Sequence, residues 1–189
     1  MRTFLREILL TVILALGIFL LIHATVQSFV IVEHCMEPNF QEGERLLVNK
    51  LAYHFSEPER GDVIILHPPS DPKAVYIKRI VALPGDTVEV KEGAVYVNGT
   101  KLDEPYIKEP PAYTLHQKII PANEYFVLGD NRNNANDSHT GWTMPRQNII
   151  GKAWLAFWPP EQLGFVHHYP LDEQLASSIK YITALTGVD

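Results

Sequence analysis

The chain has 189 residues, of which 46% are hydrophobic and 20% are charged, a composition typical of one compact domain with an ordinary core. Its formal net charge of −6 excludes the basic surface that nucleic-acid binding usually needs, so we expect no nucleic-acid partner. The only cysteine, Cys35, cannot form an intramolecular disulfide, and the eight histidines show no metal-binding spacing. We therefore expect no metal site and no cofactor.

The first predicted element is a membrane anchor. Residues 8–26, ILLTVILALGIFLLIHATV, contain no Asp, Glu, Lys or Arg, and at about 1.5 Å per residue they nearly cover a hydrocarbon core about 30 Å thick. A buried core helix and a cleaved signal peptide are the alternatives, but the small-x-small cleavage pattern is missing after Leu21. Arg2 and Arg6 precede the run, so the positive-inside tendency predicts a cytoplasmic N-terminus and an extracytoplasmic remainder.

Beyond the anchor, short apolar runs alternate with turn residues, a texture typical of antiparallel β-structure. Between two of these runs, Asn98-Gly99 indicates a tight hairpin, because both central residues of a type I′ turn need positive φ. We therefore predict a mainly β fold with a small β-hairpin lobe. The predicted strands are residues 29–32, 45–48, 63–67, 76–82, 87–90, 94–97, 125–128 and 152–157.

Three segments follow from this pattern. Residues 1–27 form a cytoplasmic stub and transmembrane anchor, residues 28–160 an extracytoplasmic β domain, and residues 161–189 a C-terminal tail. Apolar residues at helical spacing in the tail predict a short amphipathic helix that either packs on its own domain or lies on the membrane surface. These residues are Leu171, Leu175, Ile179 and Ile182.

Lys78 and Cys35 are the candidate reactive side chains. In the predicted strand 76–82, alternation puts Lys78 and Arg79 on opposite faces, so one of these two cations must point inward or into a cleft. Burial favours the neutral amine of a lysine, which is then available as a general base. A charge that protects an edge strand from aggregation is the alternative for Lys78. Cys35 is either a small buried hydrophobic residue or a nucleophile, and an activated thiol would have a pKa below its ordinary value of about 8.5.

Three ordered motifs behind an anchor resemble those of the bacterial type I signal peptidases, the S26-type family. Cys35-Met36-Glu37-Pro38 is similar to the Ser-Met-x-Pro box of the family, and Lys78-Arg79 with Leu83-Pro84-Gly85-Asp86 is similar to its lysine motif. The loop Gly129-Asp130-Asn131-Arg132, with Asp137-Ser138 downstream, is similar to its Gly-Asp-Asn-Arg box. The resemblance covers roughly residues 5–160.

The resemblance implies a membrane-bound endopeptidase, a hydrolase that removes N-terminal signal peptides from exported preproteins by a nucleophile–lysine dyad. Cys35 would then be the nucleophile and Lys78 the base, supported by the site loop of Gly129, Asp130, Asn131, Arg132 and Asp137. Apolar residues near the nucleophile would bind the small side chains at the cleavage site: Phe29, Ile31, Met36, Tyr76 and Ile77. The implied partners are preproteins and the lipid bilayer, and the implied location is the cell membrane, with a single span.

The chain departs from the family pattern around the nucleophile. Cys35 replaces the serine, Glu33 lies where a serine commonly donates to the oxyanion, and His34 replaces a glycine. Ala135 and His139 lie where a serine and an arginine are common. Two interpretations follow: an active peptidase with a Cys35–Lys78 dyad, or a catalytically silent homologue that binds signal peptides or a membrane partner.

Overall fold

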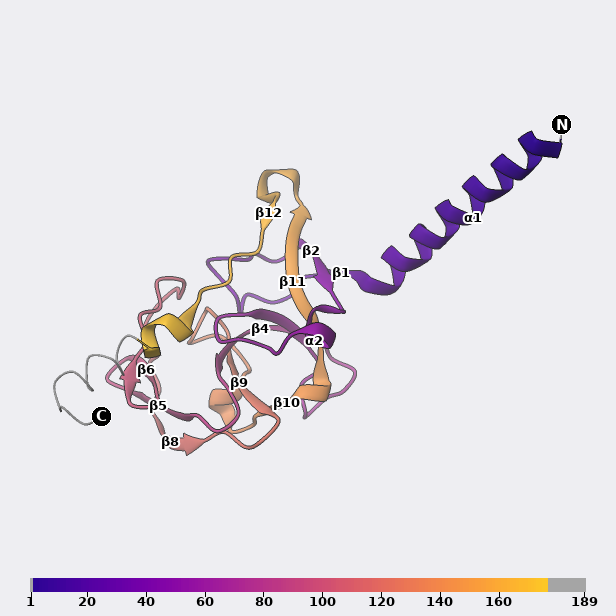
Figure 1. The fold of residues 1–189 in the computed structure, drawn as a ribbon. Coiled ribbons are helices and arrows are strands. Elements are labelled where there is room, and N and C mark those ends of the chain that lie inside the picture. Colours follow the sequence, from indigo (N-terminus) through magenta and orange to yellow (C-terminus); the bar gives the residue numbers. More distant parts are fainter. Residues whose placement is uncertain (1, 177–189) are drawn as a thin grey trace.

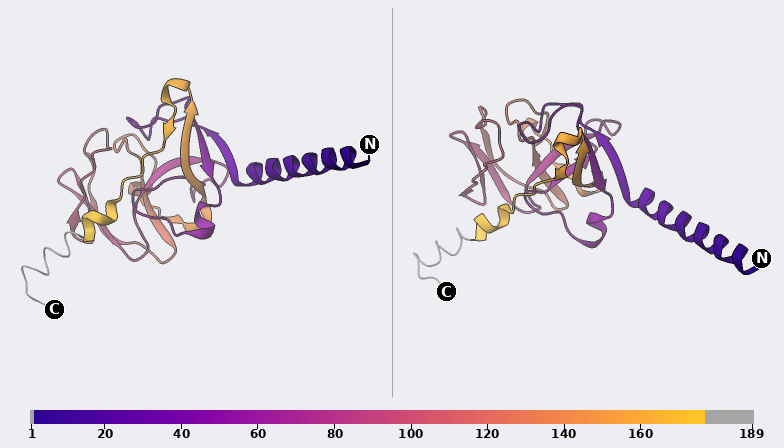
Figure 2. Two further views of the ribbon diagram at one scale, coloured as in Figure 1. Left: turned by 45° about the horizontal axis from the view of Figure 1, so that its top comes forward. Right: turned by 90° about the horizontal axis from the view of Figure 1, so that it is seen from above.

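The structure, a computed structural model, describes residues 2–176. The long helix α1 (Arg2–Thr25) projects away from the β-structure (Figures 1 and 2). Its segment Phe4–Thr25 has a mean hydropathy of 2.6 and is long and apolar enough to cross a membrane, by length and composition. Strand β1 begins at Val26, one residue after α1 ends.

Eight antiparallel strands form the larger sheet, in the order β1-β2-β11-β3-β4-β9-β10 with β12 paired to β11. Most of them coincide with predicted strands, since β-branched and aromatic residues dominate these runs. The strands are β1 (Val26–Val30), β2 (Arg45–Asn49), β3 (Val63–Leu66), β4 (Tyr76–Ala82), β9 (Glu124–Leu128), β10 (Met144–Pro145), β11 (Ile149–Trp158) and β12 (Gly164–Phe165). The short helices are α2 (Ala52–Phe55), η1 (Ser138–Thr140), η2 (Arg146–Asn148) and η3 (Pro160–Gln162).

The predicted hairpin lobe is a second, four-stranded sheet with the order β7-β6-β5-β8. Its strands are β5 (Thr87–Lys91), β6 (Ala94–Val97), β7 (Thr100–Lys101) and β8 (Leu115–Ile119). Asn98 and Gly99 both have positive φ, 51° and 78°, as the predicted tight turn requires. The structure thus confirms the predicted fold class, a mainly antiparallel β domain behind an N-terminal apolar helix.

The central strand β4 is buried on both faces, which the sequence did not reveal. Lys78 is 0% exposed and Arg79 is 1% exposed, so both cations are buried, where strand alternation required this of one. Strand β4 lies between β3 and β9, so it is an interior strand and not an edge strand of the sheet. The alternative role of Lys78 as an edge-strand charge is therefore excluded.

The tail contacts the smaller sheet. Residues 171–176 are helical, and Leu171 and Leu175 are buried in the hydrophobic cluster of that sheet. The packing of these two residues agrees with a helix that docks on its own domain. Ile179 and Ile182 lie outside the described residues.

Candidate active site

Cys35 and Lys78 meet inside the β domain. Lys78 is carried by β4, and its Nζ lies 3.0 Å from the Cys35 Sγ. The same Nζ donates to the Ile77 carbonyl oxygen at 3.0 Å and lies 4.8 Å from the centre of the Tyr76 ring. Cys35 is only 2% exposed. A thiol and an amine are thus in direct contact in a site that is largely shielded from water.

Burial raises the pKa of the Cys35 thiol above its ordinary value, because desolvation disfavours the thiolate. The neighbouring Lys78 opposes this effect, while the Glu33 carboxylate adds to it through its charge and a hydrogen bond. This direction is opposite to that expected of an activated thiol. At rest, the thiol therefore keeps its proton near neutral pH.

The loop of residues 129–132 holds the nucleophile segment in place. The Asn131 backbone N–H donates to the Cys35 carbonyl oxygen at 2.9 Å, and the Asn131 side chain donates to the His34 carbonyl oxygen at 3.0 Å. A Cβ on Gly129 would lie 2.5 Å from the Cys35 carbonyl oxygen and 2.7 Å from the Ala135 Cβ. Only a glycine lets the loop approach Cys35 this closely.

Buried ion pairs fix that loop to the rest of the domain. Asp130 accepts two hydrogen bonds from Arg79, at 2.9 and 2.7 Å, and a third from the Asn39 amide at 2.8 Å. Arg132 pairs with Glu104 in the same bidentate manner, at 2.7 and 2.6 Å. Such fork-to-fork pairs fix orientation as well as distance.

Asp137 supports the loop at Gly129, the first residue of the loop. One of its carboxylate oxygens accepts from the Gly129 backbone N–H at 2.9 Å, and the other accepts from the His139 backbone N–H at 3.0 Å. Asp137 is fully buried. Gly129 and Asn131 thus contact the nucleophile segment, whereas Asp130, Arg132 and Asp137 fix the loop that carries them, about 94 to 102 positions after Cys35 in the chain.

A small apolar pocket of about 30 Å³ is lined by Ile77, whose carbonyl oxygen contacts the Cys35 Sγ and the Lys78 Nζ, although neither of these two residues lines the pocket. Of the predicted binding residues, Phe29, Ile31, Tyr76 and Ile77 line it, together with Glu33. Met36 is not among its lining residues; it is fully buried and belongs to the same hydrophobic cluster as Cys35. A pocket of this size fits a methyl group rather than a long side chain.

Glu104 and Asn39 were missed by the sequence analysis. Glu104 lies 28 positions from its partner Arg132, in a segment without strand or helix periodicity, so no local pattern signals the pair. Asn39 directly follows the Cys-Met-Glu-Pro box, and this adjacency was the available signal. Among the described residues 2–176, no group of three or more His, Cys, Asp or Glu side chains is arranged to hold a metal ion.

Most of the chain matches a known protein family. Residues 2–158 match the family described as signal peptidase, peptidase S26. The chain belongs to this family. Signal peptidase I of Leptolyngbya laminosa is 43% identical over 166 residues, which cover 84% of this chain and 80% of that protein. The probable signal peptidase I-1 of Synechocystis is 48% identical over 136 residues, covering 68% of this chain and 69% of that protein.

A crystal structure of a signal peptidase I from Enterococcus faecalis V583 is 28% identical to the chain, with a TM-score of 0.47. The match covers 51% of this chain and 97% of that chain. Membership of the signal peptidase family confirms the resemblance drawn from the three motifs. The chain is thus a signal peptidase I-like peptidase, a hydrolase, with an N-terminal apolar helix consistent with membrane anchoring.

Proposed function

We propose that the protein is a membrane-bound signal peptidase I that cleaves N-terminal signal peptides from exported preproteins with a Cys35–Lys78 dyad. The observation that carries the proposal is the 3.0 Å contact between the Lys78 Nζ and the Cys35 Sγ in a buried site. The nucleophile and its base are within hydrogen-bond reach, as nucleophilic catalysis requires.

In the proposed reaction, Lys78 acts as a general base during the attack. Because the resting thiol is protonated, its proton passes to the Lys78 amine as the Cys35 sulfur bonds to the scissile carbonyl carbon. Collapse of the tetrahedral intermediate breaks the C–N bond, and the leaving amine takes the proton from Lys78. Water, deprotonated by the Lys78 amine, then hydrolyses the thioester, and the Cys35 sulfur regains its proton from Lys78.

The oxyanion has one evident donor. The Cys35 backbone N–H has no hydrogen-bond acceptor within residues 2–176, so it is available to the developing negative charge. Loss of a second donor in such sites typically costs about 2.7 to 4 kcal/mol of barrier height. Glu33 lies beside the thiol and would repel the oxyanion when ionised, so we expect a slower enzyme than one with two donors.

The proposed topology follows from the anchor. Helix α1 crosses the membrane once with the N-terminus in the cytoplasm, since Arg2 and Arg6 precede the apolar run. Residues 1–27 are the stub and anchor, residues 28–160 the extracytoplasmic catalytic domain, and residues 161–189 the tail. Signal peptides with small residues at the cleavage site would fit the pocket of about 30 Å³ lined by Glu33 and Ile77.

A second candidate function is binding of signal peptides without cleavage. The raised pKa of the Cys35 thiol and the adjacent Glu33 carboxylate favour it, because both oppose formation of the thiolate. The binding pocket and the supporting loop would serve either function.

Cleavage of a preprotein by the purified full-length protein in detergent distinguishes the two. We expect cleavage after an Ala-x-Ala sequence, and its loss in Cys35→Ala and in Lys78→Met, which keeps the volume of the buried stem. Lys101→Met is the matched control, because Lys101 is exposed on β7. Folded wild-type protein that binds the signal peptide but leaves it uncut would refute the peptidase and favour the silent homologue.

A further inference from the structure

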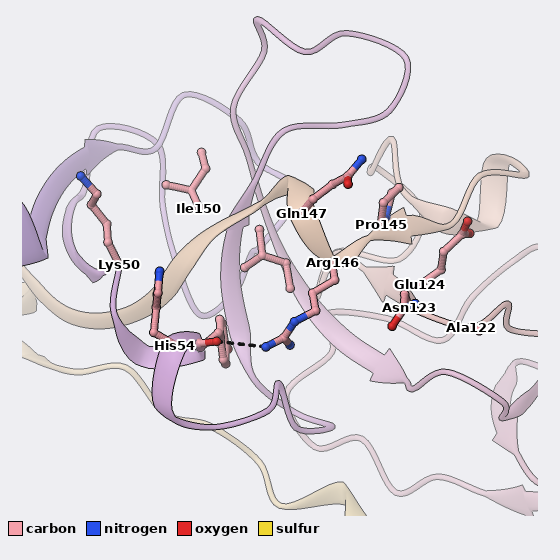
Figure 3. Close-up of a pocket in the computed structure, with 11 residues that line it drawn as sticks. Lys50, His54, Ala122, Asn123, Glu124, Pro145, Arg146, Gln147 and Ile150 are labelled. Atoms are coloured by element: carbon pink, nitrogen blue, oxygen red, sulfur yellow. Dashed lines mark hydrogen bonds between the residues drawn. The ribbon is translucent and has the colours of Figure 1, made fainter.

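A second cavity, of about 660 Å³, lies between α2 and the end of the larger sheet at β10 (Figure 3). None of its lining residues belongs to the proposed catalytic site or to the apolar pocket beside it. The polar residues that line it are Lys50, His54, Asn123, Glu124, Arg146 and Gln147.

Nitrogen donors dominate this cavity, although the whole chain has a net charge of −6. Lys50 and His54 have no ion pair or side-chain hydrogen bond within the described part of the chain. The Arg146 guanidinium points toward α2 and donates to the Tyr53 carbonyl oxygen at 3.0 Å (Figure 3). Two cationic or imidazole donors from the α2 side thus lie on the same cavity as an arginine from η2.

Two carboxylates lie at or near the cavity, against three basic side chains in its lining. Glu124 is the one carboxylate that lines it, and it accepts a hydrogen bond from the Thr143 hydroxyl. Glu57 pairs with Arg146 at 2.6 Å, but the Glu57 side chain is 79% exposed. An exposed ion pair of this kind contributes little to stability, so a phosphate can replace Glu57 at the arginine.

The cavity lies next to the outer end of the proposed membrane anchor. The Lys50 backbone N–H donates to the carbonyl oxygen of Thr25, the last residue of α1, at 2.9 Å. Figure 1 shows α2 beside the junction of α1 and β1. Phe55 of α2 is 86% exposed, and Trp154 of β11, which lines a depression together with Thr25 and Phe55, is 47% exposed. Exposed aromatic side chains beside a span are typical of the membrane interface.

We propose that this cavity binds the phosphate of an anionic phospholipid headgroup. The Lys50 backbone meets the end of α1, which places the cavity at the depth of lipid phosphates, and the lining residues Lys50, His54 and Arg146 are of kinds that bind phosphate. The inference rests on the proposed membrane anchoring, and it is independent of the proposed cleavage reaction. A bound headgroup would fix how the β domain stands on the bilayer, by holding α2 against it.

The test is a titration of the full-length protein in neutral detergent with short-chain phosphatidylglycerol, short-chain phosphatidylcholine and inorganic phosphate, by calorimetry. We expect phosphatidylglycerol to bind at least about tenfold more tightly than phosphatidylcholine or phosphate. The variant Lys50→Gln/His54→Gln should lose about fivefold or more of this preference, since one basic group near lipid phosphate contributes about that factor. Neither side chain has a partner within residues 2–176, so the fold should be unchanged.

The matched control is Lys101→Gln/His116→Gln, which removes an exposed lysine and an exposed histidine from β7 and β8 of the smaller sheet. This control should keep the full preference. Equal affinity for the two lipids, or an unchanged preference in Lys50→Gln/His54→Gln, would overturn the proposal. Inorganic phosphate that binds as tightly as phosphatidylglycerol would also overturn it, by assigning the cavity to free phosphate.

Preprotein cleavage by the same preparations separates this inference from the proposed function. A retained lipid preference without cleavage refutes only the peptidase, whereas cleavage without a lipid preference refutes only the headgroup site.

Discussion

The charged side chains of two segments of the candidate active site, the loop of residues 129–132 and the segment of residues 33–37, differ in how their charges are compensated. In the loop of residues 129–132, both charged side chains are buried in bidentate ion pairs, Asp130 with Arg79 and Arg132 with Glu104. In the segment of residues 33–37, Glu33 adds an unfavourable charge beside the thiol, and His34 is bonded only at the surface, to Glu37 at 2.8 Å and Glu42 at 3.5 Å.

This difference separates the framework from the reactive group. The buried pairs have no solvent to replace a lost partner, so each of their members is needed for folding. The nucleophile segment depends on that framework through hydrogen bonds to its backbone, which do not depend on the side chain at position 35. A thiol in place of a hydroxyl, or a carboxylate at position 33, is therefore compatible with the fold.

Asp130→Asn should have the largest effect, because it leaves the Arg79 guanidinium buried without a counter-charge. Loss of one member of a buried pair typically costs about 3 to 5 kcal/mol, which lowers the Tm of a domain of this size by about 10 °C or more. Thermal unfolding followed by circular dichroism measures this change.

Asp103→Asn is the control, since Asp103 is exposed and, among the described residues, hydrogen-bonds through its backbone alone, to Gln174. A Tm of Asp130→Asn within about 2 °C of the control would show that the framework tolerates the loss, and the distinction between the two sides would fail.

Gly129→Ala tests the contact that joins the two sides. The new methyl group would lie 2.5 Å from the Cys35 carbonyl oxygen, so the nucleophile segment has to shift. We expect a loss of about 1 to 3 kcal/mol in stability and, since a displacement of about 1 Å can cost about 100-fold in rate, a much lower kcat for preprotein cleavage.

In Gly164→Ala, the matched control, the nearest atom to the new Cβ is the Gln162 carbonyl oxygen at 3.9 Å, so both quantities should stay at the wild-type values. A Gly129→Ala protein that is destabilised but retains the wild-type kcat would mean that the loop supports the fold without positioning Cys35.

The same contrast explains what was predictable from the sequence. The three motifs predicted that Cys35 and Lys78 act together through their resemblance to a known family, whereas the strand pattern alone left a second role open for each residue. Neither signal predicted that both Lys78 and Arg79 are buried, which depends on the strands that flank β4. Strand β8 was missed because its sequence, LHQKI, is mostly polar and exposed and has no apolar alternation.

Glu33→Gln tests the reactive side and should have the smallest effect on stability but a measurable effect on chemistry. The Glu33 carboxylate helps to raise the pKa of the Cys35 thiol, so the thiolate of the wild-type protein forms only at pH values above the ordinary thiol range. Removal of this charge lowers the thiol pKa, and the thiolate then forms at lower pH. We expect the midpoint of Cys35 alkylation to fall by up to about one pH unit, and kcat/KM at neutral pH to rise by up to about tenfold.

The rate of alkylation by iodoacetamide as a function of pH measures this shift in the intact protein. Glu42→Gln is the matched control, because Glu42 is 57% exposed and contacts His34 rather than the thiol. If the Glu33→Gln and wild-type curves coincide, the Glu33 charge does not contribute to the thiol pKa. Residue 33 then affects neither the reactivity of Cys35 nor the stability of the fold. A lower alkylation midpoint with an unchanged Tm would instead show that Glu33 changes the reactivity of Cys35 and not the stability of the fold. Glu33 would then lower the reactivity of a nucleophile that the loop of residues 129–132 holds in position.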